Sequence, residues 1–519
     1  MKLDYWNHPL IVKAIRVKYR GGRLFISASA YLVILVAAGM MLAHYHQAMG
    51  IKDWVRVYFV GMIGVQFAIS AMFAIAATSS SMQSEVATRT LDFQRIATVS
   101  PLQILLGKAI GEPASSYMMA MTTLPIAVLC CTMGKVSLVS ILVLYVTMAT
   151  TTFMMACLGL QHSLDPASKG AQAGGIAGAV FFFIFAAMSV PLGFGIRGGF
   201  AEMISAAAGL FTPVLAIKGI AFEDSTIWTA TMPVFNFEIP YAVLTPLAQL
   251  ALASLALLFM TRRLTQPLLT PLSKLQSYVA LVILDGLWAT LQFNAINLGE
   301  GLTGPAVRFA VGHTVLALLL AGRTTPSRES FQSWVWRLRG RRGLAADLLI
   351  GERTLNVLAL PVYCLIGLVV FCAAVAAPVC WLRPELLAAT RWPELAMAAV
   401  TSVLVILCYG LFHQVLTVAM GRGAGVSLFV ALVIGLVGPW ALGTGFQLPV
   451  VSSLSPVATF IRLQESTLAM YPPVPLLVVH LLGIVFWAWG LFGITRRLAR
   501  QVDRRLDSMG IQAAVAATS

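Results

Sequence analysis

Apolar stretches of about 20 residues recur along the whole chain, and short polar or basic segments separate them. A helix needs about 20 mostly apolar residues to cross the hydrocarbon core of a bilayer. The pattern therefore predicts an all-α, polytopic membrane protein with about 12 transmembrane helices, arranged as two six-helix halves. The expected spans lie near residues 25–44, 56–78, 109–130, 137–160, 171–193, 241–261, 276–297, 305–321, 357–380, 396–418, 426–446 and 473–495.

Composition and charge agree with this pattern and add an orientation. Hydrophobic residues make up 59% of the chain and charged residues 11%, and the mean hydropathy is +0.86. If the N-terminus is cytoplasmic and the chain alternates across the spans, the inside segments hold 26 of the 35 basic residues. Basic residues concentrate on the cytoplasmic side of a membrane. We therefore expect a multi-pass protein of the cell (inner or cytoplasmic) membrane with both termini cytoplasmic. The same asymmetry accounts for the net charge of +15, so no nucleic-acid partner is expected.

The segment before the first span has one apolar and one basic side at helical spacing. Its apolar positions are Leu10, Ile11, Ala14, Ile15 and Val17, and its basic positions are Lys13, Arg16, Lys18, Arg20 and Arg23. This pattern is typical of a helix that lies on the membrane surface. The alternative is a basic flank that only orients the first span.

Motifs for enzymatic chemistry are missing from the sequence. It contains no G-x-x-x-x-G-K-[ST] phosphate-binding loop, no G-x-S-x-G and no H-E-x-x-H. We therefore expect no enzymatic activity, no catalytic residue, no metal site and no cofactor bound by this chain. If the protein uses ATP, a separate chain must hydrolyse it.

The first long inside loop, residues 79–108, carries the most informative charges. As a continuous helix it would place Glu85, Arg89 and Asp92 on one face, with Arg95 three residues further on. Serines before Glu85 would cap this helix, and Pro101 would end it. A short helix with a mixed-charge face suits contact with a soluble partner.

This loop resembles the region between spans 2 and 3 of type-2 ABC exporter permeases, the transmembrane subunits of ABC transporters. This chain has Arg89 at a position where that family usually has glycine. The N-terminal basic segment also resembles the family's opening, although Ala14 stands where a Glu is usual. The matching residues of the loop are Glu85, Thr90, Leu91, Thr98, Ser100, Pro101, Ile104, Leu105, Leu106, Gly107 and Lys108.

The resemblance implies a six-span permease half over residues 1–263 with an N-terminal interface helix. It implies a cytoplasmic ABC ATPase subunit as partner, present as a dimer that uses ATP, besides the lipid bilayer and further transporter subunits. Glu85, Arg89, Asp92 and Arg95 would couple the ATPase to the spans. In the outer segment 194–240 it implies short half-inserted helices, and an ordinary outer loop is the alternative.

Residues 264–519 form the second predicted half, with a basic inside loop at 322–356. In that loop Arg353-Thr354-Leu355 repeats the sequence Arg89-Thr90-Leu91 of the first half. We therefore assign Arg353 and the preceding Glu352 to ATPase coupling as well. The half is either a degenerate repeat of the first, as in transporters built from parallel repeats, or an accessory bundle beside a permease that dimerises through its first half.

Asp285 is the one carboxylate deep within a predicted span. Ionisable residues inside a membrane are costly and are often functional, so Asp285 is a candidate for the transport pathway. The alternative is a structural residue that a neighbouring helix satisfies. His313, His413 and His480, which also lie within predicted spans, are expected to hydrogen-bond between helices.

Three classes of function remain open. The first is an ABC exporter permease with a separate ATPase. The second is an ion-coupled twelve-span secondary transporter, which would usually show a Gly-x-x-x-Asp-Arg-x-Gly-Arg-Arg loop and several charges within the membrane. The third is a multispan membrane enzyme acting on lipid-linked substrates, which would need a cluster of carboxylates or histidines at a membrane face. The loop at 79–108 favours the first class, and nothing in the sequence identifies the substrate.

Overall fold

The computed structural model forms two compact units, which are described separately. Unit 1 ends at Thr265 and unit 2 begins at Gln266, apart from the short segment Val234–Asn236, which belongs to unit 2. That both units hold six spans stays a prediction. The structure describes residues 9–45, 51–91, 99–134, 136–163, 212, 217, 231–234, 237–266, 269–294, 301–337, 344–420, 435, 438–439, 442, 446, 448–464 and 474–508.

Nine helices in the described part of the chain are long and apolar enough to cross a membrane, so the chain is a helical, multi-pass membrane protein. Among the other predicted spans, 171–193 and most of 426–446 lie outside the described residues. The predicted span 276–297 is a helix, but polar side chains such as Asp285 keep it out of the nine. The nine are Phe25–His44, Trp54–Ala87, Ala114–Gly134, Leu138–Gln161, Tyr241–Thr265, Thr303–Thr324, Ala359–Leu382, Trp392–Ala419 and Val474–Gln501.

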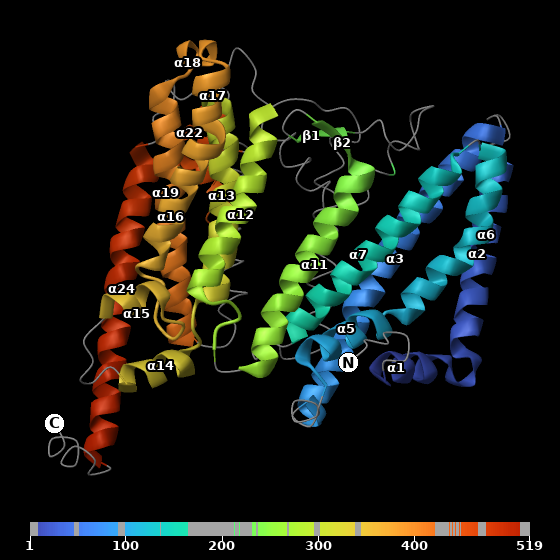
Figure 1. Cartoon of the computed structure of the whole chain (residues 1–519), viewed down its shortest axis with the longest axis horizontal. Coiled ribbons are helices and arrows are strands. Elements are labelled where there is room, and N and C mark those ends of the chain that lie inside the picture. Colours follow the sequence, from blue (N-terminus) through green and yellow to red (C-terminus); the bar gives the residue numbers. More distant parts are fainter. Residues whose placement is uncertain are drawn as a thin grey trace. The chain divides into compact units, whose positions relative to one another are not determined.

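Unit 1 combines long membrane helices with short helices at one end of the unit (Figure 1). Helix α1 lies across the ends of the long helices, beside α5. The elements are α1 (Pro9–Tyr19), η2 (Arg20–Gly22), α2 (Arg23–Tyr45), α3 (Ile51–Ala87), α5 (Pro101–Gly111), α6 (Ala114–Gly134), α7 (Leu138–Ser163), β1 (Thr231–Val234), β2 (Phe237–Pro240) and α11 (Tyr241–Thr265).

The described part of the chain is consistent with the expected all-α class and contains one small sheet besides its helices. Strands β1 and β2 form this two-stranded sheet immediately before α11, at the end of segment 194–240. Two four-residue strands joined by a two-residue connection need only local chain reversal, so they form without a larger sheet. The half-inserted helices expected in this segment lie outside the described residues. Between residues 194 and 230, the structure describes Thr212 and Ile217 alone.

Helices α3 and α7 approach each other to backbone contact at Gly159. A Cβ atom at Gly159 would lie 2.3 Å from Thr78 Oγ1 and 2.7 Å from the Ile75 carbonyl oxygen, so this approach requires glycine. Ser79 Oγ donates a hydrogen bond of 2.9 Å to the Gly159 carbonyl at the same point. The end of α3 is therefore fixed to α7 two turns before α3 terminates.

Unit 2 is a second helical bundle in which α14 lies beside the end of α19 and beside α24, which continues past it (Figure 1). Its elements are α12 (Lys274–Asn294), α13 (Thr303–Thr324), α14 (Arg328–Arg337), α15 (Leu344–Ile350), α16 (Ala359–Phe371), η3 (Cys372–Ala376), α17 (Ala377–Leu382), α18 (Glu385–Ala388), α19 (Trp392–Met420), α22 (Pro449–Ser452), α23 (Pro456–Gln464) and α24 (Val474–Ser508).

One membrane helix of unit 2 contains a π-helical turn. Element η3 joins α16 and α17 into a continuous run, and the Ala377 amide donates to the Cys372 carbonyl, five residues back. Pro378, which follows directly, has no amide hydrogen and would clash with a carbonyl in a regular α-helix. The wider π turn accommodates the proline inside the span.

Candidate functional site

Helix α3 extends beyond the predicted end of the second span at residue 78. It continues through the serines that were expected to cap a separate helix and terminates at Ala87. Arg89 then adopts φ of 58°, the left-handed region that a helix cannot continue through. The expected continuous helix from Glu85 to Arg95 is therefore wrong, and Glu85 and Arg89 do not share a helical face. Asp92 and Arg95 lie outside the described residues.

Two threonines close the end of α3. Thr88 Oγ1 donates to the Ser84 carbonyl at 2.8 Å, and Thr90 Oγ1 donates to the Glu85 carbonyl at 3.3 Å. The last carbonyls of a helix have no partner within it, so these hydroxyls satisfy them. Arg89 occupies the left-handed position after the helix, where glycine is most favourable.

Pro101 begins a helix rather than ending one, which corrects a second expectation. Ser100 is the N-cap of α5: its hydroxyl accepts from the Gln103 amide at 3.3 Å, and the Gln103 side chain accepts from the Ser100 amide at 3.0 Å. This reciprocal capping box fixes the first turn. Proline is well tolerated there because the first helical amide needs no partner.

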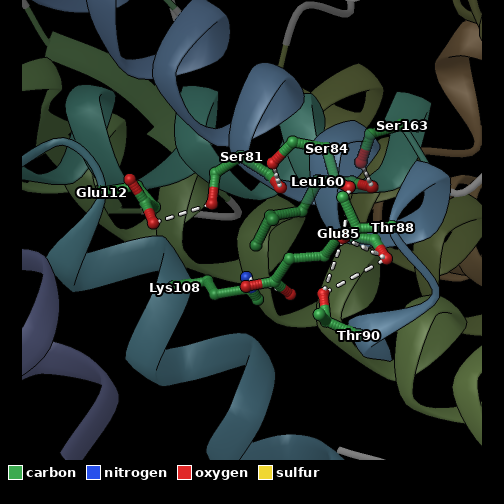
Figure 2. A network of polar contacts seen from close by, with 9 residues as sticks. All are labelled: Ser81, Ser84, Glu85, Thr88, Thr90, Lys108, Glu112, Leu160 and Ser163. Atoms are coloured by element: carbon green, nitrogen blue, oxygen red, sulfur yellow. Dashed lines mark hydrogen bonds and ion pairs between the residues drawn. The ribbon is translucent and has the colours of Figure 1, made fainter. Parts of the chain in front are cut away.

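An ion pair joins the two ends of the loop motif (Figure 2). Lys108 Nζ on α5 lies 2.7 Å from Glu85 Oε2 on α3, with the lysine side chain 3% exposed and the glutamate side chain 16% exposed. Beside it, Ser81 on α3 donates to Glu112 Oε1 at 2.7 Å. Glu85, which was expected on a docking surface, is instead paired with Lys108, and this pair was not predicted. The signal was present, since Glu85 and Lys108 are the two charged residues of the family-like motif.

The apolar residues of the motif pack behind this ion pair. Leu91 and Leu105 are buried in one cluster with Met82 of α3 and Leu160 of α7. The short segment after α3 is thus anchored to α5 and to the membrane helices. Arg89 is exposed beside this anchored segment.

Helix α1 packs directly on α5. A Cβ atom at Gly111 would lie 3.0 Å from the Ala14 Cβ and 3.3 Å from the Ile11 Cα, and Ile11 is buried. Lys13 and Arg16 are exposed. The predicted amphipathic helix is therefore present, with an apolar side on unit 1 and a basic side open to solvent. Helices α1, α5 and the end of α3 form one connected group, which we call the platform.

The corresponding region of unit 2 is built around a buried lysine. Lys274 Nζ donates to the Leu348 carbonyl and Thr354 Oγ1 at 2.7 Å each, and to the Leu355 carbonyl at 3.0 Å. Lys274 precedes the predicted span 276–297. Burial lowers its pKa from the ordinary 10.5 to about 7, and the negative charge of nearby Asp347 partly opposes this shift. The three oxygens match the three N–H donors of an ammonium group.

Glu352 and Arg353 lie in the turn between α15 and α16 and are half-buried. The next residue, Thr354, is buried, and its hydroxyl donates to the Asp347 or Gly351 carbonyl at 2.7 and 2.8 Å while accepting from Lys274. The turn is therefore attached to α12 from inside. A coupling role for Glu352 and Arg353 stays a prediction.

Asp285 and His313 form a buried pair between α12 and α13. His313 Nδ1 and Asp285 Oδ2 are 2.8 Å apart, and the residues are 4% and 0% exposed. The expected interhelical hydrogen bond is confirmed for His313. His413 on α19 contacts Thr325 Oγ1 at 3.4 Å, whereas His480 bonds to the Leu476 carbonyl of its own helix, so that expectation was wrong for His480.

Among the described residues, no group of three or more His, Cys, Asp or Glu side chains could hold a metal ion. The arrangement therefore offers two kinds of chemistry: a charged platform at one end of unit 1, and polar groups buried among the helices of unit 2. Comparisons of the chain with family models, curated proteins and solved structures gave no match.

Proposed function

We propose that the chain is the transmembrane permease subunit of an ABC transporter, an exporter driven by a separate cytoplasmic ATPase. The observation that carries the proposal is the platform. The ion pair of Glu85 and Lys108 links α3 to α5, and α1 packs on α5 at Gly111. A force applied to any of these elements therefore reaches the membrane helix α3.

Exposed basic residues make the platform suitable for a soluble partner. Arg89, Lys13 and Arg16 are exposed on its elements. Glu85 is different, because its carboxylate balances buried Lys108. We therefore assign Arg89 to contact with the ATPase and Glu85 to stiffening of the platform, and we propose contact roles for Asp92, Arg95, Glu352 and Arg353. Asp285 remains a proposed residue of the transport pathway.

The proposed orientation follows from the basic residues of the inside segments. The platform and the loop at 322–356 would face the cytoplasm, and the turn around α18 would face outward. Cysteine at Glu329, which is exposed, should react with an impermeant reagent only after permeabilisation, and cysteine at exposed Glu385 should react from outside. The test uses a chain with Ser at the exposed native Cys372 and Cys380. The reverse labelling would overturn the orientation.

The ATPase partnership is tested by purifying the tagged chain from its native membrane. We expect vanadate-sensitive ATP hydrolysis to co-purify with the wild-type chain and to be absent from the chain purified alone. Losing one member of a desolvated charge pair at an interface typically costs about 2–5 kcal/mol of binding. Arg89→Glu should therefore remove most of the co-purified hydrolysis, and Arg89→Gln should remove less.

Membrane levels of both Arg89 variants should equal wild type, because the side chain is exposed. Equal co-purified hydrolysis for wild type, Arg89→Gln and Arg89→Glu would show that this side chain contacts solvent alone. Hydrolysis by the chain without any partner would contradict the proposed division of labour.

A further inference from the structure

Two ionisable side chains lie near the middle of packed helices in unit 2. Asp285 is near the centre of α12 (Lys274–Asn294), and His313 is near the centre of α13 (Thr303–Thr324). Both are buried, and 2.8 Å separates Asp285 Oδ2 from His313 Nδ1. Placing a carboxylate inside a helical bundle is costly unless its charge is balanced.

The imidazole ring is held in one orientation. The Phe309 ring lies parallel to it, with centroids 6.0 Å apart and an interplanar angle of 3°. The ring also occupies the space over Gly367 of α16, where a Cβ atom would lie 2.4 Å from His313 Nε2. Because glycine has no side chain, this nitrogen fits against the α16 backbone.

Two atoms of the pair have no hydrogen-bond partner. They are His313 Nε2 and Asp285 Oδ1, and both are buried. Neutral imidazole that donates from Nδ1 to the carboxylate carries a bare lone pair on Nε2 and leaves the pair with one negative charge. A proton added to Nε2 makes the imidazolium ion and brings the pair to zero net charge.

Among the described residues, His313 is the group that bonds to Asp285. Arg308, the cation closest to His313 along α13, donates from Nε to Gln292 Oε1 at 3.1 Å. The other charged groups on elements packed against α12 and α13 are Lys274, Arg323, Asp347, Glu394 and Arg462. The neutral titratable groups on these elements are Tyr278, Tyr363, Cys364, Cys372, Cys408, Tyr409 and His413.

We propose that unit 2 contains a proton-binding site in the membrane interior, with His313 Nε2 as the proton acceptor and Asp285 as the counter-ion. The proton comes from water, a new N–H bond forms at Nε2, and the charge of the pair changes from −1 to 0. No electron is transferred. The inference does not depend on an ATPase partner, because it concerns equilibrium protonation of this chain alone.

The site couples proton binding to helix packing. The proton is added where the ring meets Gly367, so α16 packs against either a neutral ring or a cation. The cation strengthens the attraction between α12 and α13, because it converts a hydrogen bond to a carboxylate into an ion pair. Low pH should therefore favour the arrangement in which α12 and α13 are closed on one another.

The test is nitrogen-15 magnetic resonance of the full chain, labelled at histidine and held in lipid nanodiscs, across a pH series. The chain has seven histidines, and the signal of His313 is assigned as the one that His313→Gln removes. In wild type, that signal should change from the neutral to the imidazolium form as the pH falls. Asp285→Asn keeps the shape of the side chain but removes the counter-charge, so His313 should remain neutral at every pH.

Two further variants guard against a folding artefact. Gly367→Ala should displace the ring and shift the His313 signal, which gives a second assignment. His413→Gln, which removes a buried histidine on α19, should leave the titration unchanged. Each variant is compared only where it elutes as wild type in size-exclusion chromatography. A His313 signal that stays neutral at all pH values in wild type, or that titrates unchanged in Asp285→Asn, would overturn the proposal.

Discussion

The two units bury a lysine in different ways. In unit 1, Lys108 meets the carboxylate of Glu85 at 2.7 Å. In unit 2, Lys274 meets two carbonyls and a hydroxyl, all uncharged. A charge pair depends on one partner and fails when that partner is lost. A cluster of neutral oxygens spreads the same task over several groups, but it leaves each of them unsatisfied when the lysine is removed.

The same contrast extends to the Arg-Thr-Leu sequence that occurs in both regions. Thr90 is exposed and caps α3, whereas Thr354 is buried and links Lys274 to the carbonyls at the end of α15. The leucines, Leu91 and Leu355, are both buried. The two occurrences of the sequence therefore share a buried leucine but differ in the backbone conformation of the arginine and in the polar contacts of the threonine.

The largest effect is expected from Glu85→Gln, which leaves Lys108 buried without an opposite charge. Breaking a buried ion pair from one side typically costs about 3–5 kcal/mol, and the partial exposure of Glu85 should reduce this to about 3 kcal/mol. Adding Lys108→Met should restore most of the loss, because the double variant has no buried charge. Thermal unfolding of the purified chain in nanodiscs measures this. Equal losses in the single and double variants would show that the ion pair is not responsible.

Lys274→Met should destabilise unit 2 by about 2 kcal/mol, because it leaves the Leu348 and Leu355 carbonyls without their donor.

The same substitution should also change how the free energy of unfolding depends on pH. The folded pKa of about 7 lies below the ordinary value of 10.5, so the unfolded chain binds more protons between these limits. Wild-type stability should therefore rise with pH through this window.

Lys274→Met should flatten that rise, while the Glu85→Gln, Lys108→Met double variant should retain it. Unfolding measured at several pH values in this window gives the slopes. A slope unchanged by Lys274→Met would separate the pH response from this lysine.

The threonine pair gives a smaller, matched contrast. Thr354→Val should cost about 2 kcal/mol, because it removes a hydrogen bond to a charged group in a buried site. Thr90→Val should cost about 0.5 kcal/mol, since water can reach the carbonyl that it caps. The two variants have the same change in shape, so similar measured losses would contradict the assigned difference in burial.

The smallest effect is expected at the two arginines of the repeated sequence. Arg89 is the one non-glycine residue with positive φ in the described part of the chain. Arg89→Gly should relieve about 1 kcal/mol of strain, offset by a similar gain in unfolded freedom. Its net effect should therefore be near zero. Arg353→Gly relieves no such strain and should destabilise by about 0.5–1 kcal/mol. A larger loss at Arg89 than at Arg353 would reverse the interpretation.

Hydrophobic patterning identified the nine membrane helices because their apolar runs exceed the bilayer thickness. It failed at the end of α3, since helical spacing cannot detect the left-handed Arg89. Pro101 was misread because proline marks helix starts as well as helix ends, and the Ser100–Gln103 capping box was the cue that distinguished the two.

The pairs that define the candidate sites are contacts across helices. Lys108 and Glu85 are 23 positions apart, and His313 and Asp285 are 28 apart. Each of the four was visible in the sequence as a charged or polar residue in an unusual place. Their pairing depends on which helix faces pack together, and periodicity within a single helix carries no information on that.

Gly159 sets the closest approach between α3 and α7. Thr78 and Ser79 meet it there, and the last two turns of α3 extend beyond this point to Ala87. At 1.5 Å per residue, this part of α3 is about 12 Å long. It is tied to α5 through Glu85, and Met82 packs in a cluster with Leu160 of α7, so a displacement of α5 is expected to carry the tip of α3 with it. A bulkier residue at position 159 would separate α3 from α7 and is therefore expected to shift the tip of α3 together with α5.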